Sequence, residues 1–127
     1  MLNVAIRAAK EAGRFLKENV GKVTSIETKK GNVRDLVSEI DKASEARIIS
    51  MIKQHYSDHG ILAEESGGSE QSVEYKWVID PLDGTVNFLH GVPVFCVTIG
   101  VEHRGEIIAG VTYDPNLDEL FTAEKGS

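Results

Sequence analysis

The spacing of apolar residues changes part-way along the chain, and this change constrains the fold more than any other feature. Over residues 2–20 apolar positions recur at steps of three and four, which is the spacing of one face of a helix. These positions are Leu2, Ile6, Ala9, Gly13, Leu16 and Val20. We expect this helix to end at Gly21. A second stripe predicts a helix from Asp41, its expected N-terminal cap, to Tyr56.

Residues 23–37, between these helices, are expected to form two short extended pieces around the turn KKGN. After residue 59 the apolar stretches become short and rich in β-branched and aromatic residues, which indicates strands. They are GILAE, YKWVID, PVFCVTIGVE, EIIAGVTY and ELFTAE. Short turns separate the last three, so we expect an antiparallel meander. The pattern predicts one α+β domain, residues 1–127, with two helices packed on a mainly antiparallel β-sheet.

Composition narrows the classes of function. The net charge is −6 and no run of basic residues occurs, so nucleic acid is not an expected ligand. The amino-terminal segment is interrupted by charges, which predicts neither a signal peptide nor a membrane span. We therefore expect a cytoplasmic protein without a membrane partner. The single cysteine, Cys96, lies in an apolar run and is expected to be a small buried hydrophobe.

Acidic residues follow two of the expected strands. Glu64 and Glu65 close GILAEE, while Asp80 and Asp83 bracket a proline in DPLDGT. If the two strands are neighbours, the carboxylates converge at one edge of the sheet. Magnesium prefers carboxylate oxygens together with carbonyls, waters and substrate phosphate. The carbonyl of Leu82, presented by a proline-led turn, would complete such a set.

Gly84 and Thr85 come next and suit a phosphate. If a helix begins there, its free backbone N–H groups attract an anion. Glycine permits close approach of the phosphate, and the Thr85 hydroxyl can bind a water or a phosphate oxygen. From spacing alone a structural Asp-Gly turn explains these residues equally well.

Other candidate sites are weaker. Asp114, Asn116 and Asp118 resemble the start of a calcium loop, but Glu119 and Lys125 occupy the positions that require glycine and glutamate, so we reject it. The histidines lack metal-ligand spacing and are expected at the surface or in turns: His55, His59, His90 and His103. Trp77 and Phe88 are expected in the core.

Four segments together resemble the inositol monophosphatase family of magnesium-dependent, lithium-sensitive phosphatases. They are LVSEID at 36–41, ILAEES at 61–66, WVIDPLDGTVNFLHGVPVF at 77–95 and GVTYDPNLDELFTAEKG at 110–126. The resemblance covers essentially the whole chain. It implies the amino-terminal half of a layered αβαβα sugar-phosphatase fold, and a homodimer.

The resemblance also implies residue roles. Glu64, Asp80 and the Leu82 carbonyl would hold a first magnesium ion, and Asp80 with Asp83 would contribute to a second, in a site for two or three ions. Glu64 and Thr85 would orient the attacking water, with Asp41 supporting Thr85. Substrate-binding roles would fall to Asp83, Gly84, Thr85 and Lys30. Glu65 matches a further acid nearby.

Family members are roughly twice as long, and their second half carries a WDxAAG-type motif that this sequence lacks. We therefore expect an amino-terminal half whose last strand is left uncovered. The expected reaction is hydrolysis of a small phosphomonoester, inositol 1-phosphate first, with the activity of the chain alone left open. Alternative substrates are fructose 1,6-bisphosphate, histidinol phosphate and a nucleotide bisphosphate. The alternative of another class is a non-catalytic binding or dimerisation module, which the uncovered strand edge suggests.

Overall fold

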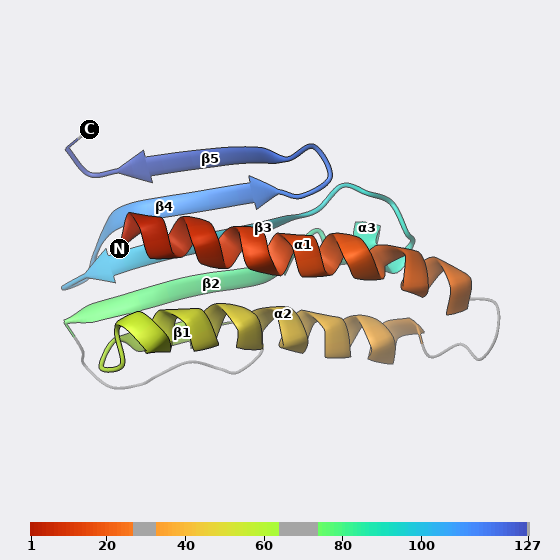
Figure 1. Ribbon diagram of the computed structural model, residues 1–127, viewed down its shortest axis with the longest axis horizontal. Coiled ribbons are helices and arrows are strands. Elements are labelled where there is room, and N and C mark those ends of the chain that lie inside the picture. The colour runs from red at the N-terminus through yellow and green to blue at the C-terminus, as the bar shows by residue number, and fades with distance from the viewer. Residues whose placement is uncertain (27–32, 64–73, 127) are drawn as a thin grey trace.

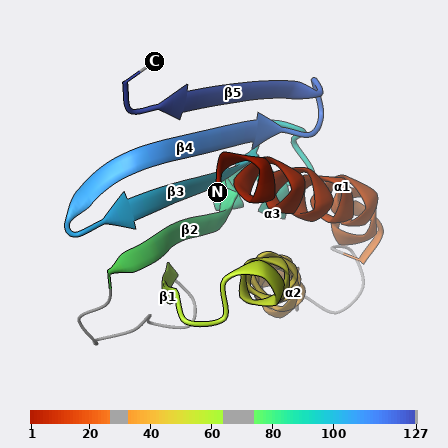
Figure 2. The same cartoon turned by 60° about the vertical axis from the view of Figure 1, so that its left-hand side comes forward.

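The computed structural model describes residues 1–26, 33–63 and 74–126. Two long helices, α1 (Leu2–Ile26) and α2 (Val33–His55), lie on one side of a five-stranded sheet (Figures 1 and 2). A third, short helix, α3 (Thr85–Leu89), follows the second strand. The strands are β1 (Gly60–Ala63), β2 (Tyr75–Asp83), β3 (Cys96–His103), β4 (Glu106–Asp114) and β5 (Glu119–Glu124).

The strands lie in the sheet in the order in which they occur along the chain. β1 pairs with β2 in parallel, whereas β2, β3, β4 and β5 form an antiparallel meander. The predicted class, two long helices on a mainly antiparallel sheet, is therefore confirmed. The GILAE and YKWVID strands are neighbours, because Ala63 pairs with Ile79, so the condition for their acids to lie at one edge of the sheet is met.

The predicted helix ends were wrong. α1 continues through Gly21 to Ile26, because Gly21 is exposed and keeps a helical backbone, where glycine costs only about 1 kcal/mol. The extended pieces predicted over residues 23–37 are helical wherever they are described, and KKGN lies outside the described residues. None of the helices in the described ranges is long and apolar enough to cross a membrane.

α2 begins eight residues before the predicted cap. Its first turn carries Asp35, whose negative charge suits the positive end of the helix dipole. Asp41 consequently lies in the helix interior, where it is 5% exposed, and the prediction that it caps the helix was wrong. The helix ends at His55, one residue before the predicted Tyr56.

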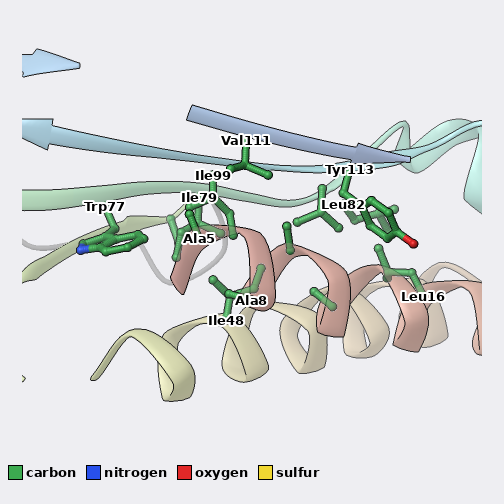
Figure 3. Close-up of a cluster of buried hydrophobic side chains, with 14 of the residues drawn as sticks. Ala5, Ala8, Leu16, Ile48, Trp77, Ile79, Leu82, Ile99, Val111 and Tyr113 are labelled. Atoms are coloured by element: carbon green, nitrogen blue, oxygen red, sulfur yellow. The ribbon is translucent and has the colours of Figure 1, made fainter. Parts of the chain in front are cut away.

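The core fills the space between the helices and the sheet. Figure 3 shows side chains from α1, α2 and the central strands pointing into this space. Trp77 and Phe88 are fully buried, as predicted. Gly13 allows α1 to approach β4 closely, because a Cβ atom at this position would lie 2.6 Å from Cδ2 of Tyr113.

Among the described residues, the opposite face of the sheet has no helix packed on it, because both long helices lie on the other side (Figure 2). Leu62, Ile107 and Phe121 line hollows on this face and are 39%, 56% and 61% exposed. Gly100 and Gly110 pair across β3 and β4 and leave this face hollow. The described part of this open face is therefore largely apolar.

Candidate metal and phosphate site

The predicted turn at Pro81 is a bulged strand. β2 continues through Asp83, and Asp80 pairs with Thr98 while Asp83 pairs with Cys96. Two residues of β2, Pro81 and Leu82, thus stand opposite one residue of β3. A bulge tolerates proline, which has no N–H to donate to the sheet. Pro81 and Leu82 are both buried, and the strand leaves the bulge with Asp83 exposed.

Gly84 turns the chain from β2 into α3. Its φ of 103° and ψ of 37° lie in the left-handed region that favours glycine. A Cβ atom here would lie 2.9 Å from the carbonyl oxygen of Val94, so the neighbouring backbone also excludes a side chain. α3 begins at the next residue, so a helix does start where the phosphate interpretation requires one, although it has only five residues.

Thr85 folds back onto the bulge. Its Oγ1 donates a hydrogen bond to the carbonyl oxygen of Leu82 at 3.2 Å. A carbonyl oxygen has two lone pairs, so Leu82 retains one for another partner. The hydroxyl predicted to orient water and the carbonyl predicted to bind metal therefore lie side by side.

α2 carries a polar band against this segment. Asp41, Ser44 and Glu45 are 5%, 0% and 6% exposed, and they interrupt an apolar stripe formed by Val37, Ile40, Ile48 and Ile52. Ser44 Oγ donates a hydrogen bond to the carbonyl oxygen of Pro81 at 2.9 Å. Ser44 thus holds the middle of the bulge from the core side. Ser44 was not among the predicted site residues, and the only sequence signal for it is a small polar residue within the apolar stripe.

The oxygen atoms at the end of β2 are of the chemical types that magnesium binds. Asp80 and Asp83 supply carboxylates and Leu82 a carbonyl, which are the hard donors that magnesium prefers. In the described ranges no group of three or more His, Cys, Asp or Glu side chains is close enough to hold a metal ion. The further predicted acids, Glu64 and Glu65, lie outside the described residues. Two carboxylates and a carbonyl are thus the described part of the predicted donor set.

Comparison with known proteins decides the family. A sequence model described as "Inositol monophosphatase family" matches residues 1–127. The chain belongs to the inositol monophosphatase family. This is a family of metal-dependent phosphatases, and the resemblance inferred from the sequence is therefore confirmed.

Curated relatives carry two kinds of name. "Nus factor SuhB" of Haemophilus influenzae is 46% identical over 127 residues, covering 99% of this chain and 48% of the relative. "Inositol-1-monophosphatase" of Mesorhizobium japonicum is 42% identical over 127 residues, again with 48% of the relative covered. The chain thus spans about half the length of the curated relatives it matches.

Solved structures of family members share the fold. The extragenic suppressor protein suhB from Bartonella henselae superposes with a TM-score of 0.85 at 41% identity, covering 98% of this chain and 48% of that one. The inositol monophosphatase from Anabaena sp. PCC 7120 gives 0.82 at 42% identity, covering 98% and 44%. The fold of this chain is therefore that of half of an inositol monophosphatase.

The structure describes only one of three residues to which the resemblance assigns further roles. Lys30 lies outside the described residues, as Glu64 does. Asp41 is described and lies in the polar band of α2, but the Thr85 hydroxyl donates to Leu82. Support of Thr85 by Asp41 therefore stays a prediction.

Cys96 is half-buried beside the site, which corrects the expectation of a buried hydrophobe. Its Sγ lies 3.7 Å from Oδ2 of Asp83. Burial, followed by the negative charge of Asp83, raises the pKa of the Cys96 thiol. The thiol therefore stays protonated at neutral pH and acts as a weak donor to a carboxylate of the predicted metal site.

His59 follows a turn, as expected, but it is buried and structural. Trp77 Nε1 donates a hydrogen bond to its Nδ1 at 2.9 Å, and its ring stacks between Tyr56 and Tyr75 with centroids 4.6 Å and 4.8 Å away. Burial lowers the pKa of His59. The ring is therefore neutral, with its proton on Nε2.

The rejected calcium loop is a turn that its own side chains stabilise. Oδ1 of Asp114 accepts hydrogen bonds from the backbone N–H groups of Asn116 and Leu117 at 2.9 Å and 3.2 Å. Oδ1 of Asp118 accepts one from the Tyr113 hydroxyl at 2.7 Å. Burial and this neighbouring carboxylate raise the pKa of Tyr113 to about 12. These carboxylates thus have structural partners.

Proposed function

We propose that residues 1–127 form the amino-terminal, metal- and phosphate-binding domain of a magnesium-dependent phosphomonoesterase. The observation that carries this proposal is the bulge at the end of β2. It brings the acids Asp80 and Asp83, the Leu82 carbonyl and the Thr85 hydroxyl into one short segment. Membership in a family of metal-dependent phosphatases supports the class of reaction.

The proposed ligands divide between two magnesium ions, with a third ion possible in the complete enzyme. Glu64, Asp80 and the Leu82 carbonyl hold the first, and Asp80 together with Asp83 the second. When bound, magnesium activates water at neutral pH and neutralises the charge of the transferred phosphoryl group. Lithium is the proposed inhibitor.

The side chains of the chain then orient the reactants. Glu64 and Thr85 direct the attacking water, and Asp41 supports Thr85. Because the Thr85 hydroxyl donates its proton to Leu82, its oxygen is left as an acceptor for that water. Gly84 leaves room for the phosphate, and the backbone N–H groups that follow it, together with Lys30 and Asp83, complete the substrate contacts.

The proposed substrate is inositol 1-phosphate. The name of the Mesorhizobium relative supports it. Fructose 1,6-bisphosphate, histidinol phosphate and a nucleotide bisphosphate remain alternatives. Because the chain spans about half of its relatives, we propose that hydrolysis needs the remaining half, and that the chain alone binds metal but turns over slowly or not at all.

A chimera tests the activity. Residues 1–127 replace the matching half of the Mesorhizobium enzyme, with an Asp80→Asn chimera as the matched control. We expect magnesium-dependent release of phosphate from inositol 1-phosphate, inhibition by lithium, and loss of both in the control. A folded chimera that hydrolyses none of the four candidate substrates would contradict the proposal.

The second candidate function is contact with a macromolecule, and the open face of the sheet favours it. Several relatives are named Nus factor, a name that refers to transcription and does not support the expected absence of nucleic acid. The net charge of −6 favours a protein partner or a second copy over direct binding of nucleic acid. Analytical ultracentrifugation tests the homodimer: a concentration-independent monomer would contradict it. A cytoplasmic location stays a prediction.

A further inference from the structure

Ser44 is a polar residue in an unusual place. Its side chain is 0% exposed, in the middle of the apolar face of α2. A serine in a helix interior commonly bonds a carbonyl of its own helix, one turn back. Ser44 instead donates to the carbonyl of Pro81, 37 residues away on β2. A hydroxyl that is buried without a hydrogen-bond partner costs free energy, and the Pro81 carbonyl is the partner that the Ser44 hydroxyl has here.

The bulge explains why this carbonyl needs a side-chain donor. The strand register gives neither Pro81 nor Leu82 a partner on β3, and in the described part of β1 the pairing with β2 reaches Ile79. The two carbonyls are held instead by two hydroxyls: Ser44 takes that of Pro81 and Thr85 that of Leu82. The carbonyls of two successive residues in the bulge are thus held by hydroxyls from different helices. Ser44 of α2 holds that of Pro81, and Thr85 of α3 holds that of Leu82.

We propose that Ser44 is a positioning residue for the metal-binding segment. Its hydrogen bond fixes the peptide plane between Pro81 and Leu82. That plane sets where the Leu82 carbonyl and the carboxylates of Asp80 and Asp83 are presented. The inference rests on the proposed function, because it requires these groups to be metal ligands.

The choice of residue at position 44 agrees with this role. The neighbouring polar residues of the band, Asp41 and Glu45, are acids, which accept hydrogen bonds when ionised and could not donate to a carbonyl. Alanine would fill the space but donate nothing. Serine is the smallest side chain that supplies the donor within a helix packed against the bulge.

Comparing magnesium with calcium binding distinguishes a residue that positions the metal ligands from one that only stabilises the fold. Magnesium requires near-ideal octahedral geometry with short bonds, whereas calcium accepts more ligands in flexible arrangements. A rotated peptide plane at Leu82 should therefore weaken magnesium binding more than calcium binding. A general loss of stability has no reason to distinguish the two ions.

The test is calorimetric titration of magnesium and of calcium into the wild-type chain and its variants, with inorganic phosphate present. Ser44→Ala removes the donor, and Ser44→Cys keeps a weak one. Ile48→Val, one turn further along α2, removes a buried methyl group but no hydrogen-bond donor, and serves as the control for stability. Urea unfolding of each variant measures the destabilisation directly.

We expect the Kd for magnesium to rise about 10- to 100-fold in Ser44→Ala, as for other residues that orient metal ligands, and by less in Ser44→Cys. Calcium affinity should change by less than about threefold, and Ile48→Val should change neither. Should Ser44→Ala not fold, Ser44→Cys against wild type decides the same question. Wild-type magnesium affinity in the Ser44 variants, or an equal loss in Ile48→Val, would overturn the role of Ser44.

An Asp80→Asn variant shows whether a negative result contradicts the role of Ser44 alone or the proposed function itself. If Asp80→Asn abolishes magnesium binding while Ser44→Ala leaves it intact, only the role of Ser44 fails. If wild type binds no magnesium, or Asp80→Asn binds as wild type does, the proposed function fails and the inference fails with it.

Discussion

Replacing Gly84 with alanine should destabilise the protein more than any other single methyl group added to a described glycine. The backbone there has a φ of 103°, and a left-handed conformation costs a residue with a Cβ atom about 1–2 kcal/mol. The new Cβ would lie 2.9 Å from the Val94 carbonyl oxygen and 3.1 Å from Cα of Phe95. Both are backbone atoms, so relief requires movement of the chain and adds about 1–3 kcal/mol.

The two contributions give an expected loss of about 2–5 kcal/mol in the free energy of unfolding. For a chain of 127 residues this lowers Tm by roughly 7–18 °C, because each kcal/mol shifts Tm by about 3.7 °C at this size. Urea denaturation followed by tryptophan fluorescence measures the loss, since Trp77 is the only tryptophan and is fully buried.

Gly21→Ala is the matched control. Gly21 lies in α1 with no atom within 4 Å of the added Cβ, so the same methyl group should stabilise the helix by about 0.5–1 kcal/mol. A loss of stability in Gly84→Ala together with a gain in Gly21→Ala would support the left-handed backbone described between β2 and α3. A Gly84→Ala protein within about 0.5 kcal/mol of wild type would refute it.

Three further outcomes follow from the packing. Gly13→Ala should cost about 1–3 kcal/mol, because its Cβ would lie 2.6 Å from the ring of buried Tyr113; a neutral result in urea denaturation would contradict that close approach. Tyr113→Phe should cost about 0.5–1.5 kcal/mol through loss of the bond to Asp118, and spectrophotometric titration of wild type should show this tyrosine ionising at about pH 12. The pKa of His59 is lowered on folding, so the unfolded state binds the extra proton: stability should be full above the unfolded value of 6.5 and fall as pH drops below it. Urea midpoints at pH 5–7.5 measure this slope, and an equal slope in His59→Gln would argue against His59 as its source.

The strands were predictable from the sequence because short apolar runs and turn residues encode them locally. The helix ends were not. Gly21 is a common stop signal, yet it lies on the exposed side of α1, where a glycine inside a helix costs only about 1 kcal/mol and does not end it. Asp41 has the chemistry of a cap but occupies the core side of a longer helix. Local signals of this kind compete with burial, which a sequence read alone does not show.

The candidate site was predictable in kind but not in geometry. The sequence DPLDGT suggests metal ligands followed by a phosphate-binding turn. α3 does begin at Thr85, with Gly84 as its N-terminal cap. The expected turn at Pro81 is a bulge because β2 continues to pair with β3 as far as Asp83. Ser44 escaped notice because its role depends on a carbonyl that loses its strand partner only in that bulge.

The central claim is that the segment from Asp80 to Asp83 binds magnesium. The most direct test is isothermal titration of magnesium into the 127-residue chain with phosphate present, beside an Asp80→Asn control. We predict saturable binding that the control abolishes. Absence of binding by a folded wild-type chain, or equal binding by both proteins, would contradict the claim.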